Sequence, residues 1–341
     1  MVKIDFRKII GFGNGGYVVS LPRRWINKNK LKKGDLLTID EGSDELTFSL
    51  NAEEQKKEEK EITIEAEGQE LDRLKTEIVS AYLNNYTSIE IISKKLLTNV
   101  IEVKDILRNL AGLEIMEQTS TRIVARDLIN INDISIENLI RRMDIIIRGM
   151  IDDCFKGIYG EDHYESIFQR DIDVNRLFYL AIRVIKNALK NPRLARAFNK
   201  DTYQLSADEL IIIRLEKIAD RQKRIARYLR SAKMRKVTVK ELEQLYQDIK
   251  KAYYDVMKAY YTNNRNIAFE IEFANKQRIK DCMGFLERNS GCYLNIDIIR
   301  KSKNKKEIET NTCVQIAKIV ENLNAMATSI KYIARTIIEH E

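Results

Sequence analysis

Two groups of side chains in this 341-residue sequence have the types and spacing needed for chemistry. Residues 21–33, LPRRWINKNKLKK, contain six basic residues and no acidic one, and Arg7 and Lys8 precede them. Guanidinium groups fit phosphate oxygens and guanine edges. Glu216 and Asp220 lie four residues apart, so on a helix their carboxylates share one face and can hold a hard or intermediate cation. The sequence therefore offers a nucleic-acid contact and a candidate metal site.

The basic segment contributes Arg23, Arg24 and Lys28 to the predicted DNA contact, together with Arg7 and Lys8. A merely solvated surface is the structural alternative. Dimerisation would double this surface around one axis, which matches the two-fold symmetry of a duplex site.

The acidic pair has its own structural alternative, in which Asp220 simply pairs with Arg224 at i+4 on a solvated face. A second basic run, 221–236, holds eight basic residues and no acidic one. We interpret this run mainly as a solvated helix face, with a second nucleic-acid contact or a docking patch for an acidic partner as the alternatives. Trp25, the only tryptophan, is predicted to anchor the short helix of the basic segment.

The sequence contains no recognisable arrangement of catalytic residues. Only His163 and His340 are histidines, and no serine or acidic partner can be assigned to either. The glycine-rich segment 11–16 has neither a long following helix nor a GK[ST] sequence, so it does not predict a phosphate-binding loop. The four cysteines form no CxxC pair, which argues against zinc, and we expect free thiols in a reducing cytosol. We predict that the chain is not an enzyme.

The overall composition favours a cytoplasmic protein with long helices. Only Pro22 and Pro192 are prolines, and proline is the residue that most strongly breaks helix interiors. No uncharged apolar run approaches the length that spans a bilayer, and the first residues lack the apolar core of a signal peptide, so we expect no membrane insertion. The formal charge of +8 suits an acidic partner.

The chain divides into segments of different character. Residues 1–50 predict four short strands and one short helix, a unit too small to bury its own core, so we expect it to be intertwined with a second copy. Residues 51–61 contain no large apolar residue and indicate a linker. Residues 62–130 predict the order βαβαββ, a small α/β module. Residues 131–341 predict six helices, arranged as two three-helix bundles in series. The predicted fold class is α+β, mainly α.

The first 50 residues resemble the SpoVT/AbrB family of swapped-hairpin DNA-binding domains. The resemblance is carried by Arg7-Lys8-Ile9, the glycine-rich turn, Val18–Pro22 and Leu31-Lys32-Lys33-Gly34-Asp35. It implies an obligate dimer with interleaved hairpins that binds DNA.

Residues 132–341 resemble the PhoU family of phosphate-uptake regulators. The segments that carry this resemblance are Leu215–Asp220, LEKIAD, followed by Ile225-Ala226, and Arg170–Phe178. The combined architecture is similar to archaeal-type phosphate-uptake regulators, and the 62–130 module fits that combination only by position.

The PhoU resemblance implies carboxylate motifs that bind metal clusters, with Glu216 and Asp220 as ligands here. The pattern is incomplete, because Asn175 stands four residues after Asp171 and Ala325 four residues after Glu321, where the family has Asp. A divalent or iron-type metal ion on the PhoU-like domain is the only cofactor that the resemblance implies, and the substitutions predict weak binding.

These inferences favour a DNA-binding transcriptional regulator of phosphate uptake and homeostasis, a homodimer or higher oligomer whose PhoU-like domain acts as a sensor or docks a partner. The alternative is an adaptor that does not bind DNA and instead binds a phosphate transporter or a sensor kinase. A metal-storage or metal-sensing bundle is a third reading, and the incomplete carboxylate motifs argue against it. The basic segment 21–33 favours the regulator over the adaptor.

Overall fold

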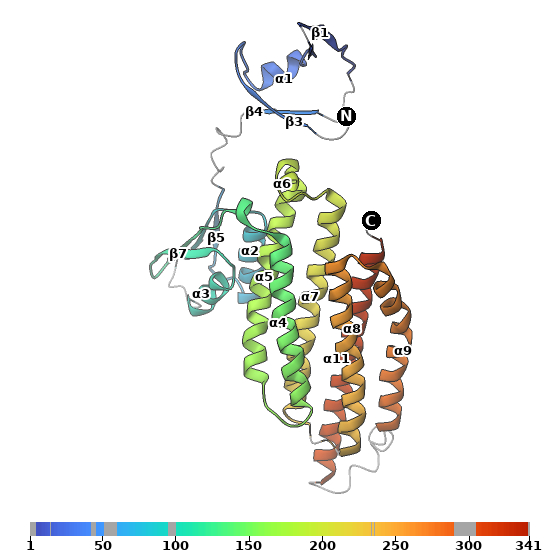
Figure 1. The fold of residues 1–341 in the computed structure, drawn as a ribbon. Helices are drawn as coiled ribbons and strands as arrows, with labels where there is room; N and C mark the ends of the chain where they lie inside the picture. The colour runs from blue at the N-terminus through green and yellow to red at the C-terminus, as the bar shows by residue number, and fades with distance from the viewer. Residues whose placement is uncertain are drawn as a thin grey trace. The chain divides into compact units, whose positions relative to one another are not determined.

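The computed structural model describes residues 5–13, 15–41, 46–50, 60–94, 100–232, 234, 236–289 and 305–339. The chain separates into two units, Met1–Glu58 and Glu59–Glu341, which we call the head and the helical unit. The class is α+β and mainly α, as the sequence predicts (Figure 1).

The head consists of two antiparallel strand pairs and one short helix. Its elements are β1 (Ile10–Phe12), β2 (Gly16–Val18), α1 (Arg23–Lys28), β3 (Leu37–Glu41) and β4 (Leu46–Leu50). β1 pairs with β2, and β3 pairs with β4 in a register that sets Leu37 opposite Leu50. The predicted order is confirmed, although β1 begins at Ile10 rather than near Phe6. Asn14, the tip of the second hairpin at 42–45 and most of the predicted linker lie outside the described residues.

The head has no hydrophobic core of its own. None of its described residues between 5 and 50 is buried. Phe6 is 90% exposed and Tyr17 is 78% exposed. The other large apolar side chains of the head that are exposed are Ile9, Ile10, Phe12, Val18, Val19, Leu36, Ile39 and Leu46. Apolar surface of this size is expected to be covered by another chain.

The helical unit starts with the α/β module that the sequence predicts. Its elements are β5 (Glu61–Glu65), α2 (Leu71–Leu83), β6 (Ser88–Ile92), α3 (Val100–Arg108), β7 (Leu113–Gln118) and β8 (Arg122–Asp127). The sheet order is β5-β6-β8-β7, with β5 parallel to β6 and the other pairs antiparallel. The two helices and the sheet bury a core that includes Ile78, Ile89 and Leu107.

Six long helices follow, with a short 3₁₀ turn at Ile131–Asp133 before them. They are α4 (Ile136–Gly157), α5 (Tyr164–Lys190), α7 (Thr202–Leu229), α8 (Lys236–Thr262), α9 (Arg265–Asn289) and α11 (Lys305–Glu339). The additional helix α6 (Pro192–Ala197) is short and was not predicted. Caps at the helix starts fit the sequence, since Ser135 caps α4 and Asp201 forms a capping box with Gln204 on α7.

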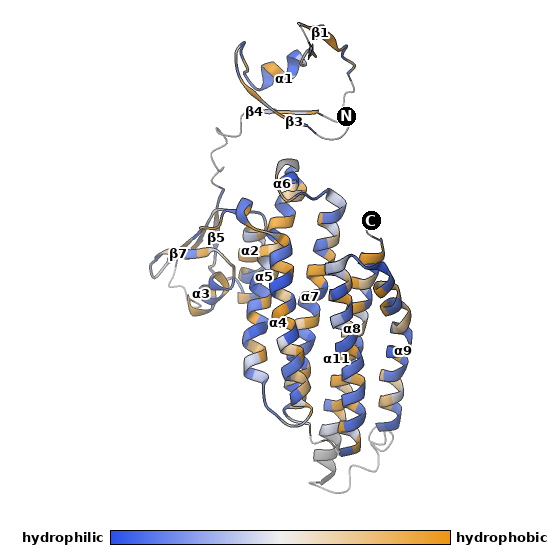
Figure 2. Cartoon of the chain, in the orientation of Figure 1, coloured by the Kyte–Doolittle hydropathy of each residue, from blue (hydrophilic) through white to orange (hydrophobic). Residues whose placement is uncertain are grey.

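The six helices form two three-helix bundles that pack side by side. α4, α5 and α7 pack together, as do α8, α9 and α11, and α7 packs along α11 between the two sets. One continuous apolar core runs through both bundles, from Ile136 in α4 to Ile337 in α11. Hydrophobic and hydrophilic positions alternate around each helix, the pattern of amphipathic helices (Figure 2).

The α/β module is joined to the bundle by a buried ion pair. Arg183 on α5 pairs with Asp127 at the end of β8, and both side chains are almost fully buried. The same guanidinium donates to Asn85 Oδ1 at 2.7 and 3.1 Å and lies 4.6 Å above the Tyr82 ring. α2 also packs against α5.

Two further observations concern the predictions from composition. No helix in the described ranges carries an apolar stretch that could cross a membrane. Cys154 and Cys282 are free and buried, but Cys313 is disulfide-bonded, so the prediction of four free thiols is wrong for this residue. The fourth cysteine, Cys292, is not among the described residues.

Candidate functional site

The predicted DNA-contact residues lie on the exposed surface of the head. Arg23, Arg24 and Lys28 belong to α1, which follows directly after Pro22, and all three are exposed. Arg7 and Lys8 precede β1 and are also exposed, and Arg7 pairs with Asp5 at 2.5 Å. No described carboxylate pairs with the other four residues, so their charges are available to a ligand.

The tryptophan of α1 faces partly inward. Trp25 is half-buried, and its carbonyl accepts the side-chain amide of Asn29 at 2.8 Å. Arg23 and Arg24, which precede Trp25 on α1, are exposed, so the helix presents positive charge to solvent.

The predicted metal ligands on α7 are occupied by basic side chains. Asp220 pairs with Arg224 at 2.9 Å, the i+4 contact that was the structural alternative, and with Lys223 at 3.3 Å. Glu216 pairs with the neighbouring Lys217 at 3.2 Å. Each carboxylate that could ligate a metal therefore already faces a positive charge.

Lys223 also crosses to the neighbouring helix. Its Nζ lies 2.6 Å from Asp171 Oδ2 on α5, and Asn175 donates to the same oxygen at 3.2 Å. Burial alone would lower the pKa of Lys223, but the hydrogen bond and charge of Asp171, with Asp220, raise it above its ordinary value. An ammonium group thus lies between carboxylates of two helices, the place where a bridging cation would bind.

The other incomplete motif behaves in the same way, since Glu321 on α11 pairs with Lys318 at 2.8 Å. The described part of the chain contains no group of three or more His, Cys, Asp or Glu side chains arranged to hold a metal ion. The donors that are present do not fit a multi-metal cluster, because basic side chains neutralise them.

Much of the basic run 221–236 is used inside the helical unit. Arg221 donates to Asn322 at 3.2 Å, and Arg230 pairs with Asp162 at 2.8 Å. Lys223 and Arg224 take part in the contacts described above, and Arg227 lies over the Tyr228 ring. Lys233 and Arg235 are outside the described residues. Arg224, Arg227 and Arg230 are exposed, as the interpretation of a mainly solvated face predicts, whereas Arg221 and Lys223 contact neighbouring helices.

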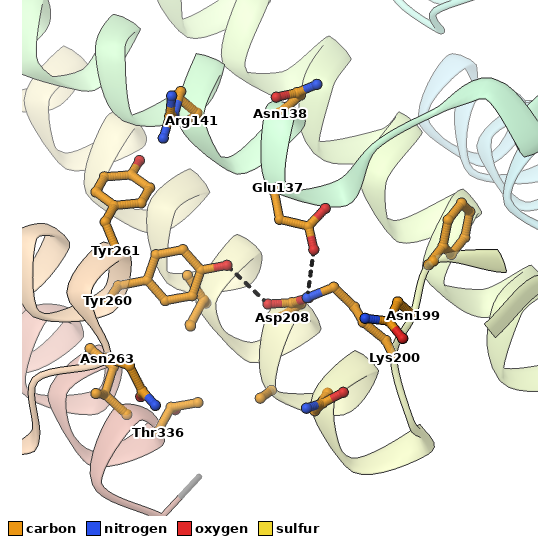
Figure 3. Close-up of a pocket in the computed structure, with 15 residues that line it drawn as sticks. Glu137, Asn138, Arg141, Asn199, Lys200, Asp208, Tyr260, Tyr261, Asn263 and Thr336 are labelled. Carbon is orange, nitrogen blue, oxygen red and sulfur yellow. Dashed lines mark hydrogen bonds and ion pairs between the residues drawn. The ribbon is translucent and has the colours of Figure 1, made fainter. Parts of the chain in front are cut away.

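A cavity that the sequence did not predict opens at one end of the two bundles. It has a volume of about 590 Å³ and is lined from α4, α7, α8, α11 and the connection between α6 and α7 (Figure 3). Ala207, Ile211, Ile337 and Phe198 supply apolar lining, and the remaining lining residues are polar or aromatic.

An ion-pair network lines this cavity and runs from the exposed Glu137 through Lys200 to the buried Asp208. Lys200 Nζ is 2.8 Å from Glu137 Oε1 and 2.7 Å from Asp208 Oδ2. Asp208 is only 4% exposed, and Tyr260 donates to its other oxygen at 3.1 Å. Burial raises the pKa of Asp208 against the opposing effect of Lys200, while the two carboxylates raise the pKa of Lys200 against its burial.

The other polar lining residues are not paired in this way. Arg141 forms no ion pair with the described residues, and its guanidinium lies 5.5 Å from the centre of the Tyr261 ring. Asn138, Asn199 and Asn263 are placed around the same cavity (Figure 3).

One pattern in the sequence indicates part of this cavity. Tyr253 and Tyr254 recur seven residues later as Tyr260 and Tyr261, which sets them on one side of α8. All four hydroxyls donate to carboxylates: Tyr253 and Tyr261 to Asp144, Tyr254 to Asp152 and Tyr260 to Asp208. Paired tyrosines at heptad spacing therefore indicated a polar seam along α8.

Comparisons with known proteins give one likeness. No family model matches the chain, and no curated protein matches it. Among solved structures, the crystal structure of PhoU from Pseudomonas aeruginosa is similar with a TM-score of 0.46 and 12% sequence identity. The match covers 59% of this chain and 95% of that chain. At this level of similarity it supports no statement about what this chain binds.

Proposed function

We propose that the chain is a DNA-binding transcriptional regulator that acts in the cytoplasm as a homodimer or higher oligomer. The head dimerises and contacts DNA, and the helical unit senses a signal or docks a partner. The PhoU-like motifs LEKIAD and Arg170–Phe178 are what link this regulator to phosphate uptake and homeostasis.

One observation carries the proposal. The head exposes all of its described residues to some degree and buries none, yet it presents Arg23, Arg24 and Lys28 together on one short helix. A second copy would cover the exposed apolar residues and would bring two such helices to one surface. Two basic helices related by a two-fold axis are suited to a duplex, whose strands are related in the same way.

The competing function is an adaptor that binds a phosphate transporter or a sensor kinase and uses the head only to dimerise. The helical unit alone does not separate the two functions. The unpaired basic residues of the head favour the regulator, because dimerisation by itself requires the apolar residues and not the charges.

A mobility-shift assay with the full chain tests the proposal. The probe is a duplex from upstream of the protein's own gene, and the variant is Arg23→Ala/Arg24→Ala. The matched control, Arg142→Ala/Arg227→Ala, removes two exposed arginines from the helical unit. We expect the head variant to lose most of the binding and the control to keep it. If the wild-type chain binds no DNA, the adaptor replaces the regulator. If both variants bind DNA equally, Arg23 and Arg24 are not the DNA contact.

A further inference from the structure

We propose that the cavity at the end of the two bundles binds a small hydroxylated organic anion, a polyol or sugar with one anionic terminus. The inference goes beyond the proposed function, because it assigns a ligand site to the helical unit. It rests on the size of the cavity, on the hydrogen-bonding capacity left around Lys200 and on the guanidinium of Arg141, which lies over the Tyr261 ring and forms no described ion pair.

The size and lining fit a small molecule. A volume of about 590 Å³ falls within the range of roughly 300–1,000 Å³ typical of small-molecule sites. The lining mixes apolar side chains, aromatic rings and converging polar groups, the composition that fixes the orientation of a polar ligand. Because residues from both three-helix bundles line it, a bound molecule would contact both.

The part of the cavity around Lys200 is rich in hydrogen-bond acceptors. An ionised carboxylate offers about four lone-pair sites. Asp208 Oδ2 lies 2.7 Å from Lys200 Nζ and is closed to solvent, whereas Oδ1 accepts from Tyr260 and keeps acceptor capacity for a ligand. Glu137 uses one oxygen for Lys200 and the other for Ser135. These acceptors suit the O–H donors of a polyol.

The same part of the cavity also keeps one donor. The Lys200 ammonium has three N–H donors, and its two carboxylate partners use two of them. The third donor, with the amides of Asn199 and Asn263, can meet the lone pairs of ligand hydroxyl groups. Such a mixture of donors and acceptors suits a hydroxyl group, because a hydroxyl both donates and accepts hydrogen bonds. Phe198 and Tyr260 also line the cavity and add aromatic surface for the C–H groups of a sugar.

The charge balance places the anionic end of the ligand at Arg141. Glu137, Lys200 and Asp208 already form one network, whose carboxylates would repel an anion. Arg141 is separate from this network, has no described carboxylate partner and is oriented against the Tyr261 ring (Figure 3). Its planar fork of donors fits a phosphate or a carboxylate. A free inorganic anion could bind Arg141 but would form no hydrogen bonds with Glu137, Lys200 and Asp208.

Calorimetric titration of the full chain with four related probes tests this assignment. Glucose 6-phosphate and glucuronate carry both features, glucose lacks the anionic group, and inorganic phosphate lacks the hydroxylated body. We expect the two sugar anions to bind at least about 10-fold more tightly than glucose or inorganic phosphate. A difference of this size corresponds to one charge-assisted hydrogen bond, which glucose lacks, or to several neutral hydrogen bonds, which inorganic phosphate lacks.

Three variants locate the site. Arg141→Ala should weaken the binding of the sugar anions by about 10- to 100-fold and leave that of glucose unchanged. Arg142→Ala, the adjacent exposed arginine that does not line the cavity, is the matched control and should change nothing. Asp208→Asn keeps the shape and should weaken glucose and the sugar anions alike.

Three results would overturn the assignment. They are the absence of sugar-anion binding at millimolar concentrations, inorganic phosphate binding as tightly as glucose 6-phosphate, and equal effects of the Arg141 and Arg142 variants. None of these measurements involves DNA, so their failure would leave the proposed regulator function standing.

Discussion

The head and the helical unit differ in how far their apolar residues are buried. The helical unit encloses its apolar side chains in a continuous core, in which Ile147, Leu215 and Ile319 are inaccessible to solvent. The head has strands and a helix but no buried residue in its described part. The difference indicates that the helical unit is stable as one chain, whereas the head completes its core only with a partner.

The two units also differ in how their charged side chains are paired. In the helical unit the carboxylates that were predicted to bind metal are paired with basic side chains, as with Lys223 between Asp171 and Asp220. In the head, the arginines of α1 have no described acidic partner. The charged side chains near these carboxylates are therefore paired within the helical unit, whereas the arginines of α1 are available to a ligand.

The buried ion pair of the helical unit gives the largest expected effect. Arg183→Met would leave Asp127 buried without its partner, and we expect the free energy of unfolding to fall by about 3–5 kcal/mol. Chemical denaturation of the full chain measures this change. The double variant Arg183→Met/Asp127→Asn should recover most of the loss, since it leaves no uncompensated charge. A loss that persists in the double variant would mean that the arginine acts through packing alone.

Alkaline pH should destabilise the helical unit through its buried tyrosines. Burial raises the pKa of Tyr82 to about 12, against an ordinary value near 10. The unfolded chain ionises first, so this contribution is intact below pH 10 and is lost as pH rises to about 12. The slope is about 1.4 kcal/mol per pH unit.

Denaturation at several pH values, with Tyr82→Phe, checks this sign and window. The variant should flatten the dependence between pH 10 and 12. A steeper fall in the Tyr82 variant would show that the sign is wrong.

The stability of the head should depend on protein concentration. If two copies share one core, each tenfold dilution lowers its apparent stability by about 1.4 kcal/mol of dimer. The transition of the helical unit should not move in the same experiment. Sedimentation of the full chain and of a chain that starts at residue 59 separates the two. The shortened chain keeps the whole α/β module, because Asp127 of that module is buried in its ion pair with Arg183 of α5. A dimer that survives without the head would place the dimer interface elsewhere.

The smallest effect is expected at the internal cation. Lys223→Met leaves Asp171 and Asp220 facing each other, and we expect a loss of about 1 kcal/mol in the free energy of unfolding. Added Mn²⁺ should restore part of this stability, because two freed carboxylates can hold a hard cation. The wild-type chain should show no such response in thermal melts. A strong Mn²⁺ response of the wild type would contradict the role assigned to Lys223.

The sequence predicted the elements better than the contacts between them. The order βαβαββ and the six helices followed from apolar periodicity, which depends on neighbours along the chain. The short helix α6 was missed because Pro192 was interpreted only as a break, although proline also fits the first turn of a helix.

The sites were harder to predict because they depend on distant residues. The i+4 pair of Asp220 and Arg224 was visible in the sequence, but the contact of Lys223 with Asp171 joins positions 52 residues apart. The cavity brings together Glu137, Lys200 and Asp208 from three separate segments, and no local pattern links them. The disulfide at Cys313 was likewise not indicated by cysteine spacing.

The salt dependence of DNA binding tests the central claim most directly. Each phosphate contact contributes about −0.9 to the slope of log affinity against log salt concentration, so a dimer with a few contacts per head should give a slope on the order of −4 to −8. Arg23→Ala/Arg24→Ala in the full chain should make this slope clearly shallower, while Arg142→Ala/Arg227→Ala should leave it unchanged. An unchanged slope in the head variant, or a slope that responds only to the helical-unit variant, would contradict the assignment of DNA binding to the head.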